Sequence, residues 1–440
     1  MNRRDFVKAG AGAFFIASAG RALGDMKPSN RVRLAVMGCH AKGRGIGVLS
    51  SLLKVPGVEV AWVCDVDSRA VAFAAGRVKK LTGVAPRTAA DIRKVLEDPT
   101  LDGIVCEAPD HWHAYAAYHA MNAGKAVYVE KPCCFCPAEG ERLVAEWKRT
   151  GQVFQMGNQR RSSHAYRAAI AWAHEGKPLG ELKFANAWYN NNRPKLKFGA
   201  PCAAPDWLDW DLWQGPAPRT AYRPGYVHYN WHWTRRWGTA ESGNNAPHFL
   251  DIARWTLGVR HPVRVVAGGG SVFSAPGDDY AWPDTFNLTF EYPGGKVITW
   301  NGTSRLQQHR MLGKGGGVIV YGTKGSLFFT PDDEVIAFDT KFRQIRKWRS
   351  NGTTDATSLT APTPGMDIQH LADFVECVRR HDQRTHSPAD EAVVSSDMPL
   401  VANIALLTGE TMRLDPETGA LRSKAGAELW SREYEKGWAF

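Results

Sequence analysis

Several features that define common protein classes are missing from this sequence. No stretch approaches the roughly 20 consecutive apolar residues that a membrane helix needs, and no segment is repeated or of low complexity. Disorder is excluded as well, because 17 Trp, 12 Tyr and 18 Phe provide more apolar surface than a disordered chain carries. The 440 residues are enough for two or three folded domains, and we expect no membrane segment in the mature protein.

A nucleic-acid-binding motif is also missing, although the formal net charge is +11 at pH 7. Part of this excess falls in the first 24 residues, and later basic pairs, such as Lys79 with Lys80 and Arg235 with Arg236, lie far apart. Nucleic-acid-binding domains concentrate their positive charge on one face or along one helix. We therefore expect no nucleic-acid partner.

The sequence also lacks ligands spaced as in a metal site. The eight cysteines include the crowded group Cys133, Cys134 and Cys136, but no second pair that would complete a zinc site. We expect thiols that formed in a reducing compartment and no bound metal.

At the N-terminus, Arg3 and Arg4 precede an apolar run of small residues from 9 to 19. This arrangement resembles a twin-arginine export signal, which implies that residues 1–24 are a signal peptide. The twin-arginine route carries folded proteins, so the resemblance further implies the export machinery as a partner, a periplasmic or extracellular location and a cofactor loaded before export. A short buried helix is the alternative, and the cleavage site stays open.

The next segment has the pattern of a phosphate-binding turn. An apolar run over 31–37 ends at Gly38, and helical periodicity follows from Gly43 to Leu53. A strand, a glycine turn and a helix in this order present free backbone amides to a pyrophosphate. Gly38 and Gly43 match the first and third glycines of G-x-G-x-x-G, whereas His40 stands at the second.

A second strand is predicted over 58–64 and ends at Asp65. A carboxylate there would bind both ribose hydroxyls and repel a 2′-phosphate, which favours NAD over NADP. Further strands over 101–108 and 126–129 alternate with a helix over 115–123, so residues 30–153 are predicted to form a doubly wound parallel sheet. Its ligand should lie at the carboxyl ends of the strands.

Two motifs at such strand ends carry a resemblance to a known family. Glu130, Lys131 and Pro132 follow one strand, and the run Ala108-Pro109-Asp110-His111-Trp112-His113-Ala114 follows another. Together they resemble the Gfo/Idh/MocA oxidoreductases, named for glucose–fructose oxidoreductase and inositol dehydrogenase, and in particular an exported branch with twin-arginine leaders. The resemblance runs from about Arg31 to the C-terminus.

The resemblance implies an α/β Rossmann domain followed by an α+β domain, here residues 154–440, with a large, mostly antiparallel open sheet and C-terminal helices that pack back toward the first domain. The residues that we expect to bind the cofactor are Gly38, His40, Gly43, Arg44, Asp65, Pro109, Asp110, Trp112, His113, Glu130, Lys131 and Gln159.

The second half agrees with this expectation. Apolar or alternating runs over 263–266, 285–292, 296–300, 318–321 and 326–329 indicate strands of one sheet. Clusters that mix aromatic rings with amides, such as 188–193 and 231–233, suit a carbohydrate, because sugar CH faces pack on rings and amides bind hydroxyls. The residues that we expect to bind substrate are Arg160, Tyr189, Asn190, Trp231, Asn244 and His248.

The reaction requires a hydride acceptor beside a C–H bond and a base beside the neighbouring O–H. In the family a carboxylate four residues before a histidine meets the reacting hydroxyl, but here the first position is Asn244, which cannot act as a base. Proton transfer is therefore predicted to depend on Lys131 and His248 as the catalytic residues.

These inferences predict an exported NAD(P)-dependent oxidoreductase that transfers hydride between a tightly bound nicotinamide cofactor and a sugar, polyol or glycoside. An NAD-dependent, redox-assisted glycoside hydrolase is one alternative, and a sugar-binding protein without turnover is another. The open sheet face leads us to expect a homo-oligomer, either a dimer or a tetramer.

Overall fold

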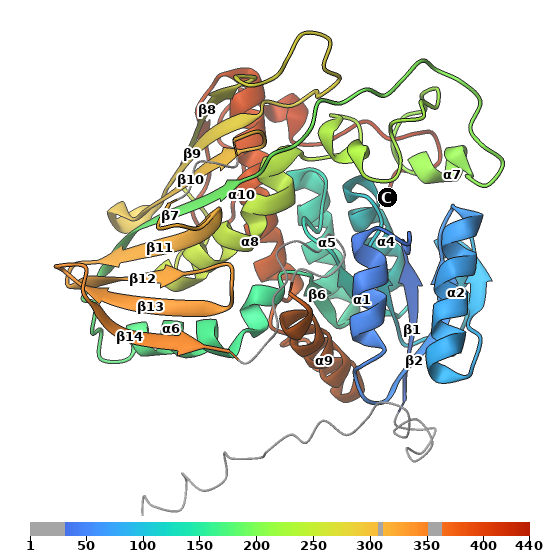
Figure 1. The fold of residues 1–440 in the computed structure, drawn as a ribbon, viewed down its shortest axis with the longest axis horizontal. Helices are drawn as coiled ribbons and strands as arrows, with labels where there is room; N and C mark the ends of the chain where they lie inside the picture. Colours follow the sequence, from blue (N-terminus) through green and yellow to red (C-terminus); the bar gives the residue numbers. More distant parts are fainter. Residues whose placement is uncertain (1–30, 307–310, 351–362) are drawn as a thin grey trace, which may run out of the picture.

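The computed structural model describes residues 31–306, 311–350 and 363–440. The predicted signal peptide lies outside these ranges. Two β-sheets dominate the described part of the chain, one in each half of the sequence (Figure 1). Within that part, no helix combines the length and the apolar character needed to cross a membrane.

The first sheet is parallel and has six strands in the order β3-β2-β1-β4-β5-β6. Its strands are β1 (Val32–Met37), β2 (Val58–Cys64), β3 (Arg87–Ala89), β4 (Gly103–Cys106), β5 (Ala126–Val129) and β6 (Phe154–Met156). Helices α1 (Arg44–Leu52), α2 (Ser68–Thr82), α3 (Ile92–Leu96), α4 (Asp110–Asn122) and α5 (Pro137–Thr150) connect them. This arrangement confirms the predicted doubly wound fold.

The strand order reverses at β1, whose neighbours are β2 and β4. In open parallel sheets such a switch point creates the crevice where ligands bind. The sheet also extends past the domain boundary that we predicted at residue 153, because β6 pairs in parallel with β5.

The second sheet has nine strands in the order β14-β13-β12-β11-β7-β10-β9-β8-β15. They are β7 (Leu182–Asn190), β8 (Arg264–Gly270), β9 (Thr285–Glu291), β10 (Val297–Thr303), β11 (Gly316–Gly322), β12 (Gly325–Phe329), β13 (Glu334–Asp339), β14 (Gln344–Arg349) and β15 (Met412–Arg413). The β7–β10 pair is parallel and the others are antiparallel, which confirms the predicted mostly antiparallel sheet.

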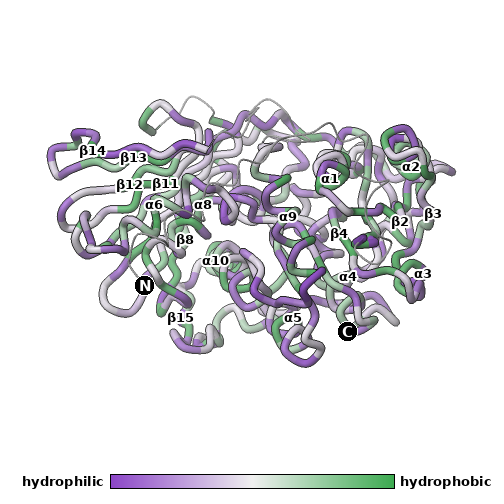
Figure 2. Tube along the Cα trace, turned by 90° about the horizontal axis from the view of Figure 1, so that it is seen from below, coloured by the Kyte–Doolittle hydropathy of each residue, from purple (hydrophilic) through white to green (hydrophobic). Residues whose placement is uncertain are grey.

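Helices α6 (His164–His174) and α8 (Ala240–Leu257) pack on this sheet, and α10 (Ala389–Thr408) contacts both α8 and α5. Helix α9 (Pro364–Arg380) packs against α1, so both C-terminal helices lie between the two sheets (Figure 1). Figure 2 shows that hydrophobic residues follow the inner strands, whereas the edge strand β14 is largely hydrophilic. The shorter elements are α7 (Trp210–Gln214) and the 3-10 turns η2 (Gln159–Ser162), η3 (Asn230–Trp233), η4 (Pro293–Gly295) and η5 (Ala427–Leu429).

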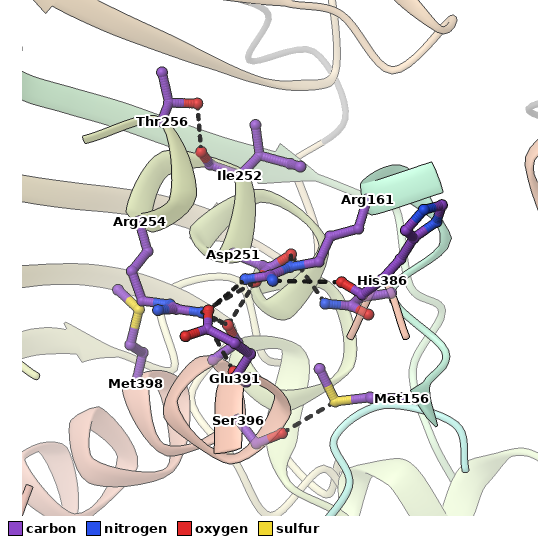
Figure 3. Close-up of polar contacts among 12 residues, drawn as sticks. Met156, Arg161, Asp251, Ile252, Arg254, Thr256, His386, Glu391, Ser396 and Met398 are labelled. Carbon is purple, nitrogen blue, oxygen red and sulfur yellow. Dashed lines mark hydrogen bonds and ion pairs between the residues drawn. The ribbon is translucent and has the colours of Figure 1, made fainter. Parts of the chain in front are cut away.

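A buried network of charges fixes α8 to its neighbours (Figure 3). Arg161 of η2 donates to both carboxylate oxygens of Asp251 on α8, at 2.8–3.0 Å. Glu391 of α10 accepts from Arg161 at 3.1 Å and from Arg254 at 2.7 Å. Ser395 also donates to Asp251, at 2.6 Å. The network joins the segment after β6 to the helix that carries Asn244 and His248.

All eight cysteines lie in the described part of the chain, and none of them forms a disulfide. Seven are buried, and Cys202 is exposed. Cys39, Cys64 and Cys106 sit at or just beyond the ends of β1, β2 and β4, so they belong to the interior of the first sheet.

Candidate active site

A cleft with a cavity volume of about 330 Å³ opens at the carboxyl ends of β1, β2, β4 and β5. Residues of the second half, from β7, η3 and α8, line its other side. All twelve residues that we predicted to bind the cofactor line this cleft, as do Tyr189, Trp231, Asn244 and His248 of the predicted substrate set. Which of them touch a ligand stays a prediction.

The glycine turn after β1 is tight and is held by backbone hydrogen bonds: Gly38 N–H donates to Cys64 O and Gly43 N–H donates to His40 O, each at 2.9 Å. Gly38 has φ +81°, and a Cβ atom there would lie 2.6 Å from the backbone oxygen of Glu107. Gly43 is the N-cap of α1, and no side chain caps this helix end. A helix start without a side-chain cap suits an anion such as a pyrophosphate.

His40 occupies the position where the glycine pattern has its second glycine. Its ring stacks on His228 from the second half, with centroids 3.9 Å apart and planes inclined by 15°. His228 Nε2 lies 2.9 Å from Asp67 Oδ2, and burial lowers the pKa of His228 to about 4. The two imidazoles therefore form a neutral stacked pair at the edge of the cleft.

Asp65 lies at the end of β2, as predicted. Its carboxylate accepts hydrogen bonds from the backbone N–H groups of Cys39 (2.7 Å) and Asp67 (3.0 Å), which ties the strand end to the glycine turn. Burial raises the pKa of Asp65. Each oxygen keeps a second lone pair, so the group can still accept from a ribose hydroxyl.

A segment of the second half lies across the end of β2. Ser68 N–H donates to Trp207 O at 3.0 Å, Asp209 N–H donates to Val66 O at 3.1 Å, and the guanidinium of Arg69 lies 3.3 Å above the Trp207 ring. The two halves therefore meet on both sides of the cleft.

Arg44, the first residue of α1, organises the charges at the centre of the cleft. It donates to both oxygens of Asp367 on α9, at 2.8 and 2.7 Å, and its Nε lies 3.4 Å from Glu130 Oε1. A Cβ atom on Gly157 would lie 2.7 Å from Glu130 Oε1, so glycine makes room for this carboxylate. Glu107, which the motifs did not single out, lines the same region.

Lys131 connects the dinucleotide half to α8. Its Nζ donates to the carbonyl oxygen of Asn244 at 2.7 Å and to Asn244 Oδ1 at 3.1 Å. The turn that holds it is fixed by His113, whose ring nitrogens lie 2.6 Å from Pro132 O and 2.7 Å from Ala108 O. Lys131 and Asn244, predicted separately from two motifs, are thus direct neighbours.

Two neutral imidazoles flank this pair. Burial, and next the Lys131 charge, lower the pKa of His248 well below its usual value, and its Nδ1 has no partner in the described part of the chain. His232, which was not predicted, has its pKa lowered in the same direction by burial. Because His232 Nδ1 lies 2.6 Å from Tyr229 O, a neutral ring carries its proton there and leaves Nε2 as an acceptor.

Asp110 and Trp112, in the first turn of α4, form one wall of the cleft. Asp110 Oδ2 accepts from the hydroxyl (2.6 Å) and the amide (3.2 Å) of Thr239, the N-cap of α8, and burial raises its pKa. Trp112 Nε1 donates to Trp213 O at 2.9 Å. These contacts position the start of α8 against the first sheet.

Further residues of the cleft were not among the predicted site residues. Arg193 donates to both oxygens of the buried Glu241, at 3.0 and 3.2 Å, and to the hydroxyl of Tyr229 at 2.5 Å. Asn191 and Asn245 add amide groups to the same wall. Asn191 and Arg193 belong to the cluster 188–193 that we predicted to suit a carbohydrate, although neither was named as a site residue.

Arg160 and Asn190, both in the predicted substrate set, are not among the residues that line the cleft. Arg160 donates to the hydroxyl of Tyr166 at 2.9 Å and lies 4.9 Å above the ring of Phe249. Asn190 is buried, and its side-chain oxygen accepts from Thr303 at 2.9 Å.

The residues present fit a nicotinamide dinucleotide. The turn at Gly38 and the uncapped start of α1 suit the pyrophosphate, Asp65 suits a ribose, and Lys131 with Glu130 lies where the two halves meet. The fold and this site together define a two-domain protein with an NAD-binding Rossmann domain and a sheet domain that closes the cleft.

Comparison with known proteins identifies the family. The profile of the oxidoreductase family with an NAD-binding Rossmann fold, GFO_IDH_MocA, matches residues 32–158, and that of the GFO/IDH/MocA C-terminal domain matches residues 213–328. Together the two ranges span more than half of the chain. The chain belongs to the Gfo/Idh/MocA family.

Among curated relatives, a glycosyl hydrolase family 109 protein of Stenotrophomonas maltophilia (strain K279a) is 28% identical over 210 residues, which are 46% of this chain and 44% of that protein. The scyllo-inositol 2-dehydrogenase (NAD(+)) of Bacillus subtilis (strain 168) is 30% identical over 159 residues, 34% of this chain and 43% of that protein. The matches thus span less than half the length of these relatives.

Solved structures share the fold over most of the chain. An oxidoreductase domain protein from Kribbella flavida has a TM-score of 0.66 at 16% identity, covering 87% of this chain and 99% of that one. A levoglucosan dehydrogenase in complex with NADH and levoglucosan has a TM-score of 0.62 at 16% identity, covering 84% and 97%. At these identities the likeness concerns the fold alone.

Proposed function

We propose that this protein transfers hydride between a tightly bound NAD and a hydroxyl or carbonyl group of a sugar, polyol or glycoside. The observation that carries the proposal is the position of Lys131, which reaches from the dinucleotide half to Asn244 on α8, in one cleft with the neutral imidazole of His248. When bound, NAD would supply the acceptor or donor of the hydride.

Lys131 and the residues around it have separate roles in the proposed reaction. The Lys131 ammonium donates a hydrogen bond to the reacting oxygen and holds it as its charge changes. His248 is neutral because of its burial, so its imidazole can take the hydroxyl proton. Asn244 orients Lys131, and Tyr189, Asn191 and Asn245 bind further hydroxyl groups of the substrate.

The relatives support a cyclic polyol or sugar as the substrate class, because one of them is an inositol 2-dehydrogenase and one structural neighbour is a levoglucosan dehydrogenase. The aromatic wall with Trp231 suits the CH face of such a ring. Tight retention of NAD is supported by the segment that lies across the end of β2. Tight retention would also suit export of the loaded protein. From the twin-arginine pattern we propose such export and a periplasmic or extracellular location.

A second candidate is an NAD-dependent glycoside hydrolase, in which transient oxidation of the sugar loosens the glycosidic bond and NAD is regenerated within each cycle. Two of the relatives, from Stenotrophomonas maltophilia (strain K279a) and Saccharopolyspora erythraea, are glycosyl hydrolase family 109 proteins, and this favours the second candidate.

A substrate screen separates the two candidates. The full chain is incubated with inositols, free sugars and aryl glycosides while nicotinamide absorbance and released aglycone are recorded. Lasting NADH formation supports the oxidoreductase, whereas aglycone release without net NADH supports the hydrolase.

The Lys131→Met variant should still bind NAD but lose turnover by about 100-fold or more. The matched control Lys80→Met, on the exposed face of α2, should behave as the unsubstituted protein. Turnover that survives in Lys131→Met would contradict the proposal.

A further inference from the structure

Glu107 is a carboxylate inside the cleft to which neither family motif assigns a role. It follows β4, whose residues alternate between two packed layers: Cys106 belongs to the layer with α4, and Val105 to the layer with α1 and α9. Glu107 therefore points toward α1 and α9, below the start of α1. Both of its carboxylate oxygens are buried and have no hydrogen-bond partner in the described part of the chain.

Its surroundings are rich in negative charge. Glu130, after β5, and Asp367, on α9, both contact the guanidinium of Arg44, and Glu107 lies in the same group. Arg44 donates to Asp367 and Glu130, and the Lys131 amide donates to Glu130 at 3.2 Å. Among the described residues, Glu107 is the carboxylate of this group that receives no donor.

A carboxylate without a donor in such a place favours its neutral form. Burial, followed by the charge of Glu130, raises the pKa of Glu107 well above its usual value, while Arg44 and Lys131 oppose the shift less strongly. Tyr128 of β5 also faces the group, but burial raises its own pKa, so it stays neutral. Protonation makes Glu107 a hydrogen-bond donor at the base of the glycine turn.

We propose that Glu107 is a proton-linked cofactor-binding residue: it is kept as the neutral acid when the dinucleotide binds and donates a hydrogen bond within the pyrophosphate end of the site. The backbone of Glu107 packs against Gly38, and its Cβ lies 3.1 Å from where a Cβ on Gly45 would be, so the residue is part of the turn itself. An ionised Glu107 would add repulsion beside the phosphates.

This arrangement couples NAD binding to pH. The phosphates bring further negative charge next to Glu107, which raises the proton affinity of its carboxylate. NAD binding therefore takes up a proton at any pH at which Glu107 is ionised in the free protein. By linkage, the affinity for NAD is highest at low pH and falls by up to about tenfold per pH unit once the pH exceeds the pKa of Glu107 in the free protein.

The test is calorimetric titration of NAD into the full chain after removal of any bound dinucleotide, from mildly acidic to alkaline pH and in two buffers of different ionisation heat. The unsubstituted protein should take up protons and lose affinity as the pH rises. Glu107→Gln, which keeps the shape and a donor but cannot ionise, should lose both effects and bind at high pH about as tightly as the unsubstituted protein at low pH. The control Glu97→Gln changes an exposed glutamate and should alter nothing.

Proton uptake that persists unchanged in Glu107→Gln, or that is absent from the unsubstituted protein, would overturn the proposal. Should Glu107→Gln fail to fold, infrared spectra of the unsubstituted protein decide: a protonated-carboxyl band that strengthens when NAD binds at alkaline pH supports it, and the absence of such a change overturns it. Because the readout is cofactor binding, the outcome does not depend on whether the proposed sugar chemistry is correct.

Discussion

The amide of Asn244 determines how charge is distributed around the reacting centre. Its side-chain oxygen and its backbone carbonyl both accept from Lys131, so neutral acceptors hold the ammonium in place. His248, one helical turn further along α8, therefore faces a cation without a compensating carboxylate. This arrangement, added to burial, keeps the imidazole in its neutral, proton-accepting form.

Replacing Asn244 by Asp tests this account of His248. A carboxylate four residues before the histidine raises the pKa of the imidazole back toward its ordinary value, because it favours the charged form. A histidine that must accept a proton works only above its pKa. The acid limb of the profile of kcat/KM against pH should therefore move upward, by about one pH unit.

Asn122→Asp provides a matched control, because it makes the same chemical change at an exposed position at the end of α4. Its profile should coincide with that of the unsubstituted protein. An active Asn244→Asp enzyme whose acid limb does not move would show that His248 does not accept the proton, and His232, the other neutral imidazole beside Lys131, would then be the next candidate.

At the scale of elements, the position of α8 depends on the buried charges of Figure 3. Burial disfavours the charge on Asp251, but Arg161, with its hydrogen bonds, and Arg254 lower the pKa of this carboxylate below its usual value. Breaking a buried pair leaves charge without compensation, which costs about 3–5 kcal/mol. Asp251→Asn should lower the free energy of unfolding by about that amount in chemical denaturation.

Asp91→Asn is the matched surface control. Arg93 and Asp91 form an equally close pair, 2.7 Å apart, but the arginine side chain is 47% exposed, and Asn can still cap α3. The expected loss is at most about 1 kcal/mol. Equal losses in the two variants would contradict a special role for the buried network.

Elements with a simple pattern could be predicted from the sequence. The predicted strand 58–64 coincides with β2, because a run that is apolar except for Glu59 lies between a glycine and an aspartate. Helix α8 begins at Ala240, before the apolar positions of its later turns. Its first turns are fixed by tertiary contacts, including hydrogen bonds of Asn403 with Ser242 and Thr239, which no local periodicity reveals.

The residues of the site also divide into those that the sequence pattern predicts and those that it does not. Residues at strand ends, such as Asp65 and Lys131, were predictable because parallel strands bring their carboxyl ends together. Arg193 and His232 fall in the predicted clusters 188–193 and 231–233, but their places in the cleft depend on tertiary contacts, such as that of Arg193 with Glu241, which the sequence does not reveal. Glu107 left a signal that was not used, namely a charged residue that directly follows a buried apolar strand.

At the scale of the whole molecule, the cleft is a joint product of the two halves. Residues from the first sheet and from β7, η3 and α8 line one cavity, and a segment of the second half lies across the end of β2. A ligand that fills this cavity must therefore stabilise both halves against unfolding.

NAD should accordingly raise the unfolding temperature of the full chain as a single transition. At a free concentration of about 100 times Kd, binding to the native state alone contributes about 2.7 kcal/mol. Differential scanning calorimetry measures the shift.

NADP should give a smaller shift than NAD, because its 2′-phosphate meets Asp65. Gly38→Ala should abolish the shift, since a Cβ would lie 2.6 Å from Glu107 O at φ +81°. Two transitions of which NAD moves only one would show that the halves unfold independently and that the cleft does not join them.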